Sequence, residues 1–292
     1  MWQVRVPASV ANLGSGFDAL GLALALYLEA AGGPAEADGF LYQGEGELRL
    51  ERPGESLLHR AWRAAWRRIG EAPPPLYVEV FNPIPLARGL GSSAAARVAG
   101  AALADLASGG RLGRDGVFAV AAELEGHPDN AGASAYGGLV VGVGRPWRAV
   151  SLPVPEALLV AVAVPPFEVP TAAARGLLKG PVAREDAVFN LARAALWPAA
   201  LAAGRWELLA EAARDRLHQE ARASLMPGAL EAIEAAQEAG ALAAFVGGAG
   251  PAVAALLERH KADRVGRALS QYAGEGRVLL LEAAEGYTWK EI

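Results

Sequence analysis

A loop at residues 82–91, rich in proline and glycine, leads directly into a helix of small residues. Gly89 and Gly91 allow left-handed backbone conformations and leave room for another group to approach the chain closely. The first backbone N–H groups of a helix have no partner within it and lie at the positive end of its dipole. Such a turn, here containing Ser92 and Ser93, favours the binding of a polyphosphate.

Three alternatives to a phosphate loop can be compared with these residues. Judged by its glycines alone, the segment is more often a turn with a serine N-cap and no ligand. A P-loop requires a lysine after its last glycine, and no lysine follows Gly91. A dinucleotide fingerprint requires a strand directly before the glycines and an acid about 20 positions later. Here two prolines intervene, and the nearest acid, Asp105, lies in the same helix.

The composition excludes several other classes of protein. The 292 residues suffice for two modest domains, and 53% hydrophobic residues can fill their cores. The absence of cysteine excludes disulfides and Cys-ligated zinc, and the four scattered histidines lack zinc-site spacing. A net charge of −5 without a basic face argues against a nucleic-acid partner.

Signals for membranes or export are also missing from the sequence. The longest apolar run, residues 20–28, is shorter than the roughly 18 residues that a spanning helix needs. The N-terminal segment lacks the basic and then apolar layout of a signal peptide. We therefore expect a cytoplasmic protein without a membrane partner.

The expected helices and strands divide the chain into two halves. Pro153 and Pro155 lie between them, so we expect domains at residues 1–155 and 156–292. Helices and strands do not alternate regularly, which favours the α+β class over a doubly wound parallel sheet. Strands are expected at residues 2–6, 20–28, 76–81, 136–143, 158–164, 243–246 and 278–281, with a hairpin at 42–50. Helices are expected at residues 56–69, 92–108, 114–125, 171–178, 184–203, 205–213 and 227–239.

Three further motifs accompany the loop. The opening motif reads Pro7-Ala8-Ser9-Val10-Ala11-Asn12-Leu13-Gly14-Ser15-Gly16-Phe17-Asp18. The central motif reads Glu125-Gly126-His127-Pro128-Asp129-Asn130 and is followed by Tyr136-Gly137-Gly138. The third motif reads Gly247-Gly248-Ala249-Gly250-Pro251. With Pro85-Leu86-Ala87-Arg88-Gly89-Leu90-Gly91-Ser92-Ser93, they resemble the GHMP kinase superfamily, and the opening and central motifs resemble its homoserine kinase branch.

This resemblance spans residues 7–251 and implies both a fold and an activity. Members have an N-terminal domain with a left-handed βαβ unit and a ferredoxin-like C-terminal domain, with the active site in the cleft between them. The homoserine kinase branch uses ATP and Mg²⁺ to phosphorylate the hydroxyl of L-homoserine, giving O-phospho-L-homoserine for threonine biosynthesis. Relatives often dimerise, so a homodimer is expected by analogy.

The resemblance also implies which residues bind homoserine, which carries an ammonium, a carboxylate and a hydroxyl. The implied substrate-binding residues are Asn12, Asp18, His127, Asn130, Arg175 and Arg222. An aspartate suits the ammonium, an asparagine suits the hydroxyl, and two arginines offer the carboxylate two-point contacts. Taken singly, each residue has a plainer role in a turn, a loop or a solvated helix face. The ordered match to one family favours the functional role.

The implied ATP-binding residues form two groups. They are Pro83, Ile84, Pro85, Leu86, Ala87, Arg88, Gly89, Leu90, Gly91, Ser92 and Ser93 on the loop, and Ser56, Leu57 and Leu58 beside the adenine. Ser56 departs from the asparagine that the family often has. The implied Mg²⁺ ligands are Ser93 and Glu123, with Glu125 as the alternative. Residues two apart on a helix point about 200° apart, so only one of these glutamates can face the site.

The implied catalytic residues are Asn130, Asp129 and His127. An amide cannot act as a general base near neutral pH, so we favour direct in-line attack by a hydroxyl that Asn130 orients. The proton then passes to phosphate or solvent. Asp129 as a base is the competing mechanism.

Two other functions stay open at this point. A related kinase could act on a mevalonate-type or polyol alcohol, but it would have little use for Asp18 and the paired arginines. A catalytically inactive relative that only binds a ligand would be expected to lose the phosphate loop, which is intact here.

Overall fold

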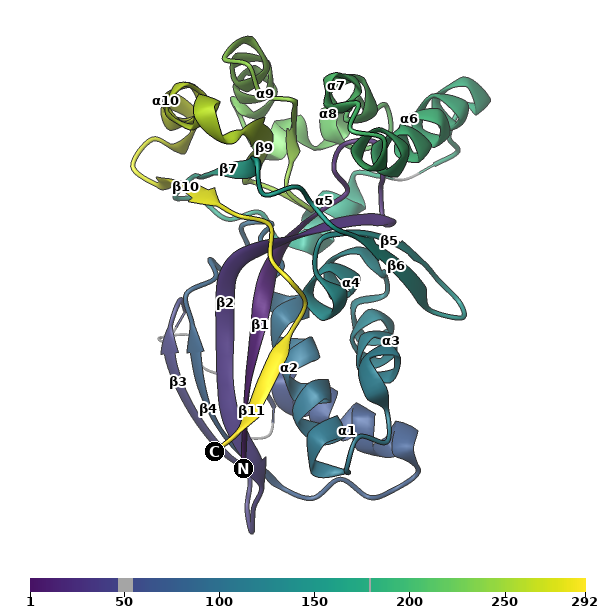
Figure 1. Ribbon diagram of the computed structural model, residues 1–292, viewed down its shortest axis with the longest axis vertical. Helices are drawn as coiled ribbons and strands as arrows, with labels where there is room; N and C mark the ends of the chain where they lie inside the picture. The colour runs from purple at the N-terminus through teal and green to yellow at the C-terminus, as the bar shows by residue number, and fades with distance from the viewer. Residues whose placement is uncertain (47–54, 179) are drawn as a thin grey trace.

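Two β-sheets form the framework of the protein, one above the other in Figure 1. The computed structural model describes residues 1–46, 55–178 and 180–292. Within these residues one sheet has seven strands and the other four. Helices and strands follow one another without regular alternation, which confirms the α+β class.

The seven-stranded sheet contains most of the N-terminal half. Its strands are β1 (Trp2–Ala11), β2 (Leu20–Pro34), β3 (Gly39–Gly44), β4 (Leu76–Asn82), β5 (Leu139–Val143), β6 (Arg148–Leu152) and β11 (Thr288–Glu291). β1 begins with Val4 and Val6 buried and Arg5 exposed, the pattern of a strand with one face on a core. From Pro7 onward it is buried on both faces, because it enters the interior and leads to the opening motif.

Helices α1 (Leu57–Ile69), α2 (Ser92–Ala107), α3 (Gly113–Glu125) and α4 (Asp129–Tyr136) lie beside one face of this sheet (Figure 1). The small residues of α2 allow a close approach to α1. A Cβ atom on Gly100 would lie only 2.1 Å from the carbonyl oxygen of Leu58. α1 also connects the parallel neighbours β3 and β4, which gives a βαβ unit.

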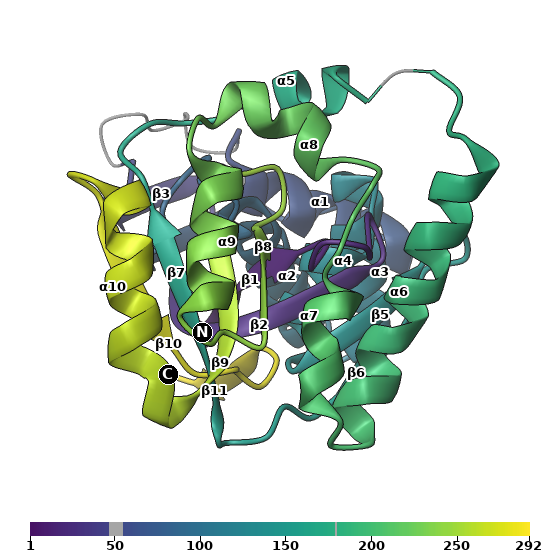
Figure 2. The same cartoon turned by 90° about the horizontal axis from the view of Figure 1, so that it is seen from above.

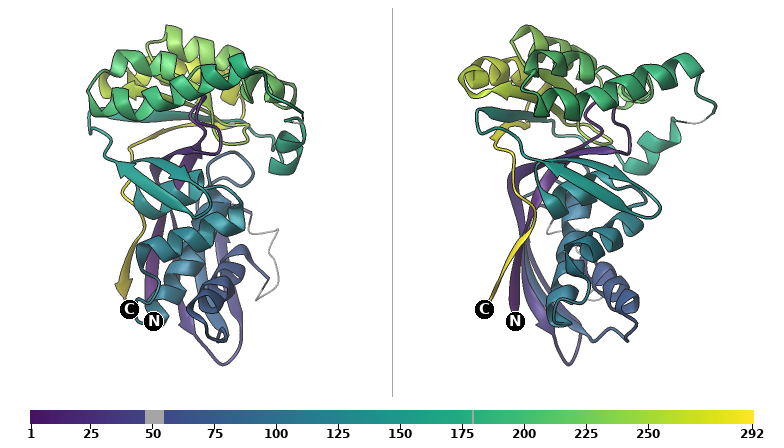
Figure 3. Two further views of the ribbon diagram at one scale, coloured as in Figure 1. Left: turned by 90° about the vertical axis from the view of Figure 1, so that its right-hand side faces the viewer. Right: turned by 45° about the vertical axis from the view of Figure 1, so that its right-hand side comes forward.

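The four-stranded sheet has the ferredoxin-like order that the resemblance implied. It contains β7 (Leu158–Val164), β8 (Ala243–Val246), β9 (Val253–Glu258) and β10 (Arg277–Leu281), in the order β10-β7-β9-β8. Helices α9 (Ala229–Glu238) and α10 (Ala262–Ala273) complete the βαββαβ sequence and lie over the sheet (Figure 2). An insertion after β7 holds α5 (Thr171–Gly176), α6 (Arg184–Ala202), α7 (Leu209–Ala212) and α8 (Gln219–Arg222). Helices α6 to α10 form the upper layer in Figure 3, whereas α5 lies below the four-stranded sheet (Figure 1).

Some expected elements differ from the structure. The hairpin at residues 42–50 is wrong for its described part, because β3 pairs in parallel with β4. Residues 47–50 of that hairpin lie outside the described residues. Within the described residues, six α-helices and β-strands lie outside the expected ranges: α4, β6, α8, β9, α10 and β11. In the described parts of the chain, no helix is both long and apolar enough to cross a bilayer.

The division into domains at residues 155 and 156 stays a prediction, and the topology suggests one change to it. β7 begins at Leu158, shortly after the proposed boundary. β11, however, returns to the first sheet and pairs with β1. The N–H of Ile292 donates to the carbonyl oxygen of Met1 at 3.0 Å, so the two ends of the chain lie together (Figure 1). We propose that β11 belongs with the N-terminal domain.

The side chain of Trp197 joins the upper helices to the opening motif. It is 1% exposed, and its Nε1 donates to the carbonyl oxygen of Leu13 at 2.9 Å. We predict that Trp197→Ala lowers the free energy of unfolding by about 3–5 kcal/mol, because it leaves a cavity. Trp289→Ala, at a position 55% exposed, should change it by at most about 0.5 kcal/mol. Urea unfolding of both variants measures the difference, and similar losses would contradict this role of Trp197.

Candidate active site

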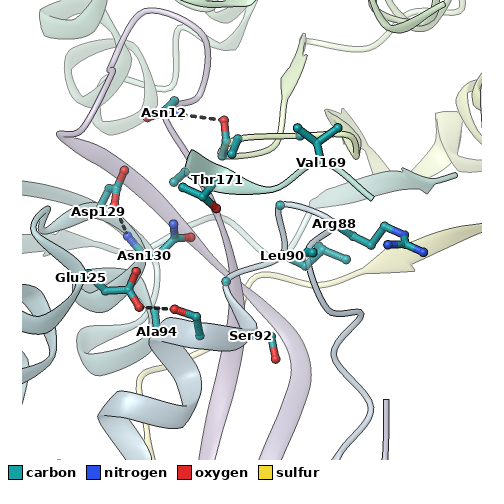
Figure 4. A pocket seen from close by; sticks show the side chains of 18 of the residues that line it. Asn12, Arg88, Leu90, Ser92, Ala94, Glu125, Asp129, Asn130, Val169 and Thr171 are labelled. Atoms are coloured by element: carbon teal, nitrogen blue, oxygen red, sulfur yellow. Dashed lines mark hydrogen bonds between the residues drawn. The ribbon is translucent and has the colours of Figure 1, made fainter. Parts of the chain in front are cut away.

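A cavity of about 130 Å³ lies where the two halves meet. Figure 4 shows side chains of the opening motif, the loop, the central motif and residues 169–171 around it. The predicted residues that line it are Asn12, Asp18, Pro85, Ala87, Arg88, Gly89, Leu90, Gly91, Ser92, Ser93, His127, Asp129, Asn130, Arg175 and Arg222. The structure therefore brings all six predicted substrate-binding residues to the same cavity as the phosphate loop.

Backbone contacts with both halves hold the phosphate loop in place. Ser9 on β1 donates its N–H to the carbonyl oxygen of Leu90 at 3.1 Å. Gly89 has φ of 78°, and a Cβ atom there would lie 2.0 Å from the carbonyl oxygen of Gly247. Gly91 has φ of 70° and is the N-cap of α2. Both glycines are therefore required by conformation and by space.

A second, largely apolar cavity of about 240 Å³ adjoins the first, since Ala87, Ser92 and Ser93 line both. Ser56, Leu57, Leu58 and Leu86 line it, as expected for the adenine side. The sequence analysis did not identify its aromatic wall, Phe40 and Tyr42. Pro83 and Ile84 do not appear among the described lining residues of either cavity. Ile84 is fully buried in the core, so its role is packing.

Glu125 lies on the loop side of α3, and Glu123 does not. Glu125 accepts a hydrogen bond from Ser93 Oγ (Figure 4). The Glu123 carboxylate is 64% exposed and lies 3.7 Å from Arg68 on α1. Glu123, the predicted Mg²⁺ ligand, therefore lies away from the phosphate loop, and the alternative, Glu125, lies beside it. Glu123 and Glu125 point about 200° apart on α3, so only one of them can face the phosphate loop. The packing of α3 on α2 places Glu125 there.

Arg97, which the sequence analysis missed, lies beside Ser93 and Glu125. Its Nη1 donates to Ser93 Oγ at 2.6 Å and also contacts the Glu125 carboxylate. Burial lowers the pKa of Arg97 from its ordinary value, although the group stays charged. The spacing of four residues from Ser93, which places both on one helix face, was the available signal.

The opening motif turns sharply at the cavity. Asn12, Leu13 and Asp18 all have positive φ, at 71°, 46° and 55°, an uncommon conformation for residues other than glycine. Asn12 stabilises this turn: its Nδ2 donates to the carbonyl oxygen of Gly248 at 2.8 Å, and its Oδ1 accepts from the N–H of Asp18 at 3.0 Å. Strained backbone of this kind is typical of functional sites.

Two arginines line the cavity and differ in their burial and in their ion pairing. Arg175 on α5 forms a two-point ion pair with Asp18, at 2.6 and 3.0 Å. Hydrogen bonding to Asp18 raises the pKa of Arg175. Arg222 is 1% exposed, and among the described residues no carboxylate lies within ion-pair distance of it. Burial lowers the pKa of Arg222, and the charge of Arg175 lowers it further.

The central motif supplies a compact polar cluster. Asp129 is 1% exposed and accepts from the N–H of Asn130 at 2.7 Å, and its Oδ1 lies 2.5 Å from Nδ1 of His127. Ser9 Oγ donates to Oδ1 of Asn130 at 2.9 Å. The Nδ2 group of Asn130 then has no partner among the described residues and remains available to a ligand. Ser9 belongs to the opening motif, but no role was predicted for it from the sequence.

Comparison with known proteins identifies the family. The chain matches the GHMP kinases N terminal domain at residues 56–138 and the GHMP kinases C terminal model at residues 199–275. It is 61% identical over 290 residues to a homoserine kinase of Thermus thermophilus, covering 99% of this chain and 98% of that protein. A homoserine kinase of Moorella thermoacetica is 43% identical over 269 residues, covering 91% and 90%.

A solved structure agrees with these relatives. The crystal structure of homoserine kinase from Cytophaga hutchinsonii superimposes with a TM-score of 0.88 at 28% identity, covering 99% of this chain and 96% of that one. The same fold, the two family matches and the high identity over almost the whole length lead to one assignment. The chain belongs to the homoserine kinases of the GHMP kinase family.

Proposed function

We propose that the protein transfers the γ-phosphate of ATP to the hydroxyl of L-homoserine, giving O-phospho-L-homoserine. The observation that carries this proposal is the set of charges beside the phosphate loop. Asp18, Arg175 and Arg222 line one cavity with Ser92 and Ser93. An acceptor with an ammonium and a carboxylate fits these charges, and the homoserine kinase relatives support the same acceptor.

The Asp18–Arg175 pair favours a zwitterion in particular. A ligand that displaces this pair must offer a cation to Asp18 and an anion to Arg175, or one charge loses its partner in a partly buried site. The ammonium and carboxylate of an amino acid meet both demands. A mevalonate-type alcohol has no ammonium and would leave Asp18 unpaired. This alternative therefore fits the site less well.

The loop and the apolar cavity are suited to ATP. We propose that the phosphates lie against the N-terminus of α2 and that the adenine enters the cavity lined by Leu57, Leu58, Phe40 and Tyr42. Aromatic and aliphatic walls suit a planar base, and the first turn of a helix suits phosphates. The two cavities share Ser92 and Ser93, which supports a γ-phosphate directed toward the substrate cavity.

We propose Ser93 and Glu125 as the residues that hold Mg²⁺. A hydroxyl and a carboxylate are the hard oxygen donors that this ion prefers, and both lie beside the expected phosphates. When bound, the ion neutralises charge that develops on the phosphates during transfer. Arg97 adds a second positive charge at the same place.

The central motif orients the hydroxyl. With Oδ1 of Asn130 bound by Ser9, its Nδ2 is placed to donate to the substrate oxygen and hold it in line with the γ-phosphate. Asp129 already accepts hydrogen bonds from Asn130 and His127, which favours a structural role over that of a base. We therefore retain direct attack, with the proton passing to phosphate or solvent.

A homodimer and a cytoplasmic location remain proposals by analogy with relatives. Light scattering of the purified protein would establish the first, and fractionation of cells the second.

A panel of acceptors tests both the function and the carboxylate site. We expect wild type to consume ATP with L-homoserine and to discriminate strongly against 3-aminopropanol, which lacks the carboxylate. Arg222→Ala should lower kcat/KM for L-homoserine by roughly 30- to 5,000-fold, as expected for loss of one partner of a buried charge pair. Arg222→Lys should recover only part of this, because a lysine ammonium keeps the charge but loses the planar group that also donates to the carbonyl oxygens of Gly248 and Ala174.

The KM for ATP and the activity toward 3-aminopropanol are the matched controls, and both should change little in Arg222→Ala. If this variant still prefers L-homoserine as strongly as wild type does, Arg222 does not bind the carboxylate. If wild type itself shows no preference, the proposed acceptor is wrong.

The two glutamates of α3 provide a test of the metal site. Glu125→Gln should lower turnover by more than about tenfold and raise the Mg²⁺ concentration at half-saturation, because an amide is a weaker ligand than a carboxylate. Glu123→Gln, the matched control two residues away, should behave like wild type. Calorimetric titration of Mg²⁺ with a non-hydrolysable ATP analogue measures binding without turnover. Equal effects of the two substitutions would exclude Glu125 as the specific ligand.

Asp129→Asn separates the two routes for the proton. Under direct attack, the pH–rate profile above pH 6 should keep its shape, even if the rate falls through disturbed hydrogen bonds. A true general base would be revealed by loss of a titrating limb together with a fall of about 10²- to 10⁴-fold. Steady-state rates between pH 6 and pH 9 at saturating ATP decide between them.

A further inference from the structure

His218 is buried between the opening motif and the arginine proposed for the carboxylate. It immediately precedes α8 and is 1% exposed. Its Nε2 lies 2.8 Å from the carbonyl oxygen of Gly14, and its Nδ1 lies 3.3 Å from Nη1 of Arg222. The ring also packs against Phe17, with 5.2 Å between centroids. One imidazole therefore contacts both the loop that carries Asp18 and the arginine.

These two neighbours determine which nitrogen of His218 carries the proton. A carbonyl oxygen can only accept, so Nε2 must donate to Gly14. A guanidinium can only donate, so Nδ1 must accept from Arg222. The neutral imidazole with its proton on Nε2 satisfies both contacts at once. The other tautomer fails at both nitrogens, and the doubly protonated ring would direct an N–H at Arg222.

The surroundings favour the neutral ring as well. Burial lowers the pKa of His218 from its ordinary value. Asp215, whose Oδ2 is 3.7 Å from Nε2, and Asp18 oppose this effect, and the charge of Arg222 adds to it. Among these influences on the pKa of His218, burial is the largest.

The other contacts of Arg222 leave one nitrogen for a ligand. Nη1 also donates to the carbonyl oxygen of Gly248 at 3.0 Å, and Nε donates to that of Ala174 at 3.4 Å. Nη2 has no hydrogen-bond partner among the described residues, and Arg222 lines the substrate cavity. His218 is the only side chain of the described structure with a hydrogen bond to this guanidinium.

We propose that His218 is a positioning residue for the acceptor: as a neutral acceptor at Nδ1 it fixes the Arg222 guanidinium and aligns it with the opening motif. The inference rests on the proposed function, because it takes the carboxylate of the acceptor as the ligand of Arg222. His218 itself does not line the cavity and touches no substrate.

Three substitutions separate the two hydrogen bonds. His218→Asn keeps an acceptor oxygen near the position of Nδ1 and loses the donor to Gly14. His218→Gln places a donor near the position of Nε2 and loses the acceptor for Arg222. His218→Leu loses both. Gln219→Leu is the matched control, because Gln219 is buried on the same short helix and accepts from the N–H of Val246 without contacting Arg222.

We expect His218→Leu to lower kcat/KM for L-homoserine by about ten- to a hundred-fold, the effect of losing a hydrogen bond to a charged group. The change should lie mainly in the KM for L-homoserine. The KM for ATP and the activity toward 3-aminopropanol should stay close to wild type. His218→Asn should recover most of the loss and His218→Gln little of it. Gln219→Leu should lower the melting temperature and leave the KM for L-homoserine unchanged.

Each outcome decides the question. If His218→Leu lowers activity toward both acceptors equally, or if His218→Gln recovers more activity than His218→Asn, the positioning role is wrong. If His218→Leu does not fold, as judged by circular dichroism, the comparison of the Asn and Gln variants decides alone. A wild-type enzyme without preference for L-homoserine over 3-aminopropanol would instead overturn the proposed function, which distinguishes the two failures.

Discussion

The close approach of the phosphate loop to the C-terminal half is the contact on which the rest of the site depends. The backbone of Gly89 lies so near the carbonyl oxygen of Gly247 that no side chain fits between them. The carbonyl oxygen of Arg88 accepts from Ala252, and that of Leu90 accepts from Ser9. The N-terminus of α2 is therefore fixed against both sheets. Groups from distant parts of the sequence can face it at defined distances because the loop is hydrogen-bonded to segments of both sheets.

The charges around this loop are incompletely paired, and their imbalance has a physical cost. The buried guanidinium of Arg222 has no acid within ion-pair distance in the described parts of the chain, and backbone oxygens and His218 replace its lost hydration there. An apolar side chain of similar volume would be expected to stabilise the fold. The structure thus retains a charge that folding does not need. We propose that its partner is an anion that enters the cavity, so an acceptor with a carboxylate fits the site better than one without.

Part of this structure could be predicted from the local sequence. The helix at Leu57–Ile69 and the loop before Ser92 follow from periodicity and glycine placement, and the family resemblance predicted six substrate-binding residues that line the cavity. No role was predicted for Ser9, Arg97 or His218, which the proposals also use. β9 was missed because it is buried on both faces and shows no alternation, and β11 because all of its residues are exposed. The choice between Glu123 and Glu125 depends on the rotation of α3 about its axis. That rotation is set by packing on α2, so the local sequence cannot predict which glutamate faces the loop.

The return of the chain to its first sheet has a mechanical consequence. The backbone passes between the halves at residues 153–157, and again at residues 282–287 before β11. Residues from both crossings line one surface depression, and none of the residues described as lining it belongs to the acceptor cavity. The two crossings are adjacent and join the halves along one side. Together with the close contact of Gly89 with Gly247, they restrain the halves against rotating relative to each other. The arginines and the phosphate loop are thereby held in alignment across the cavity that they line.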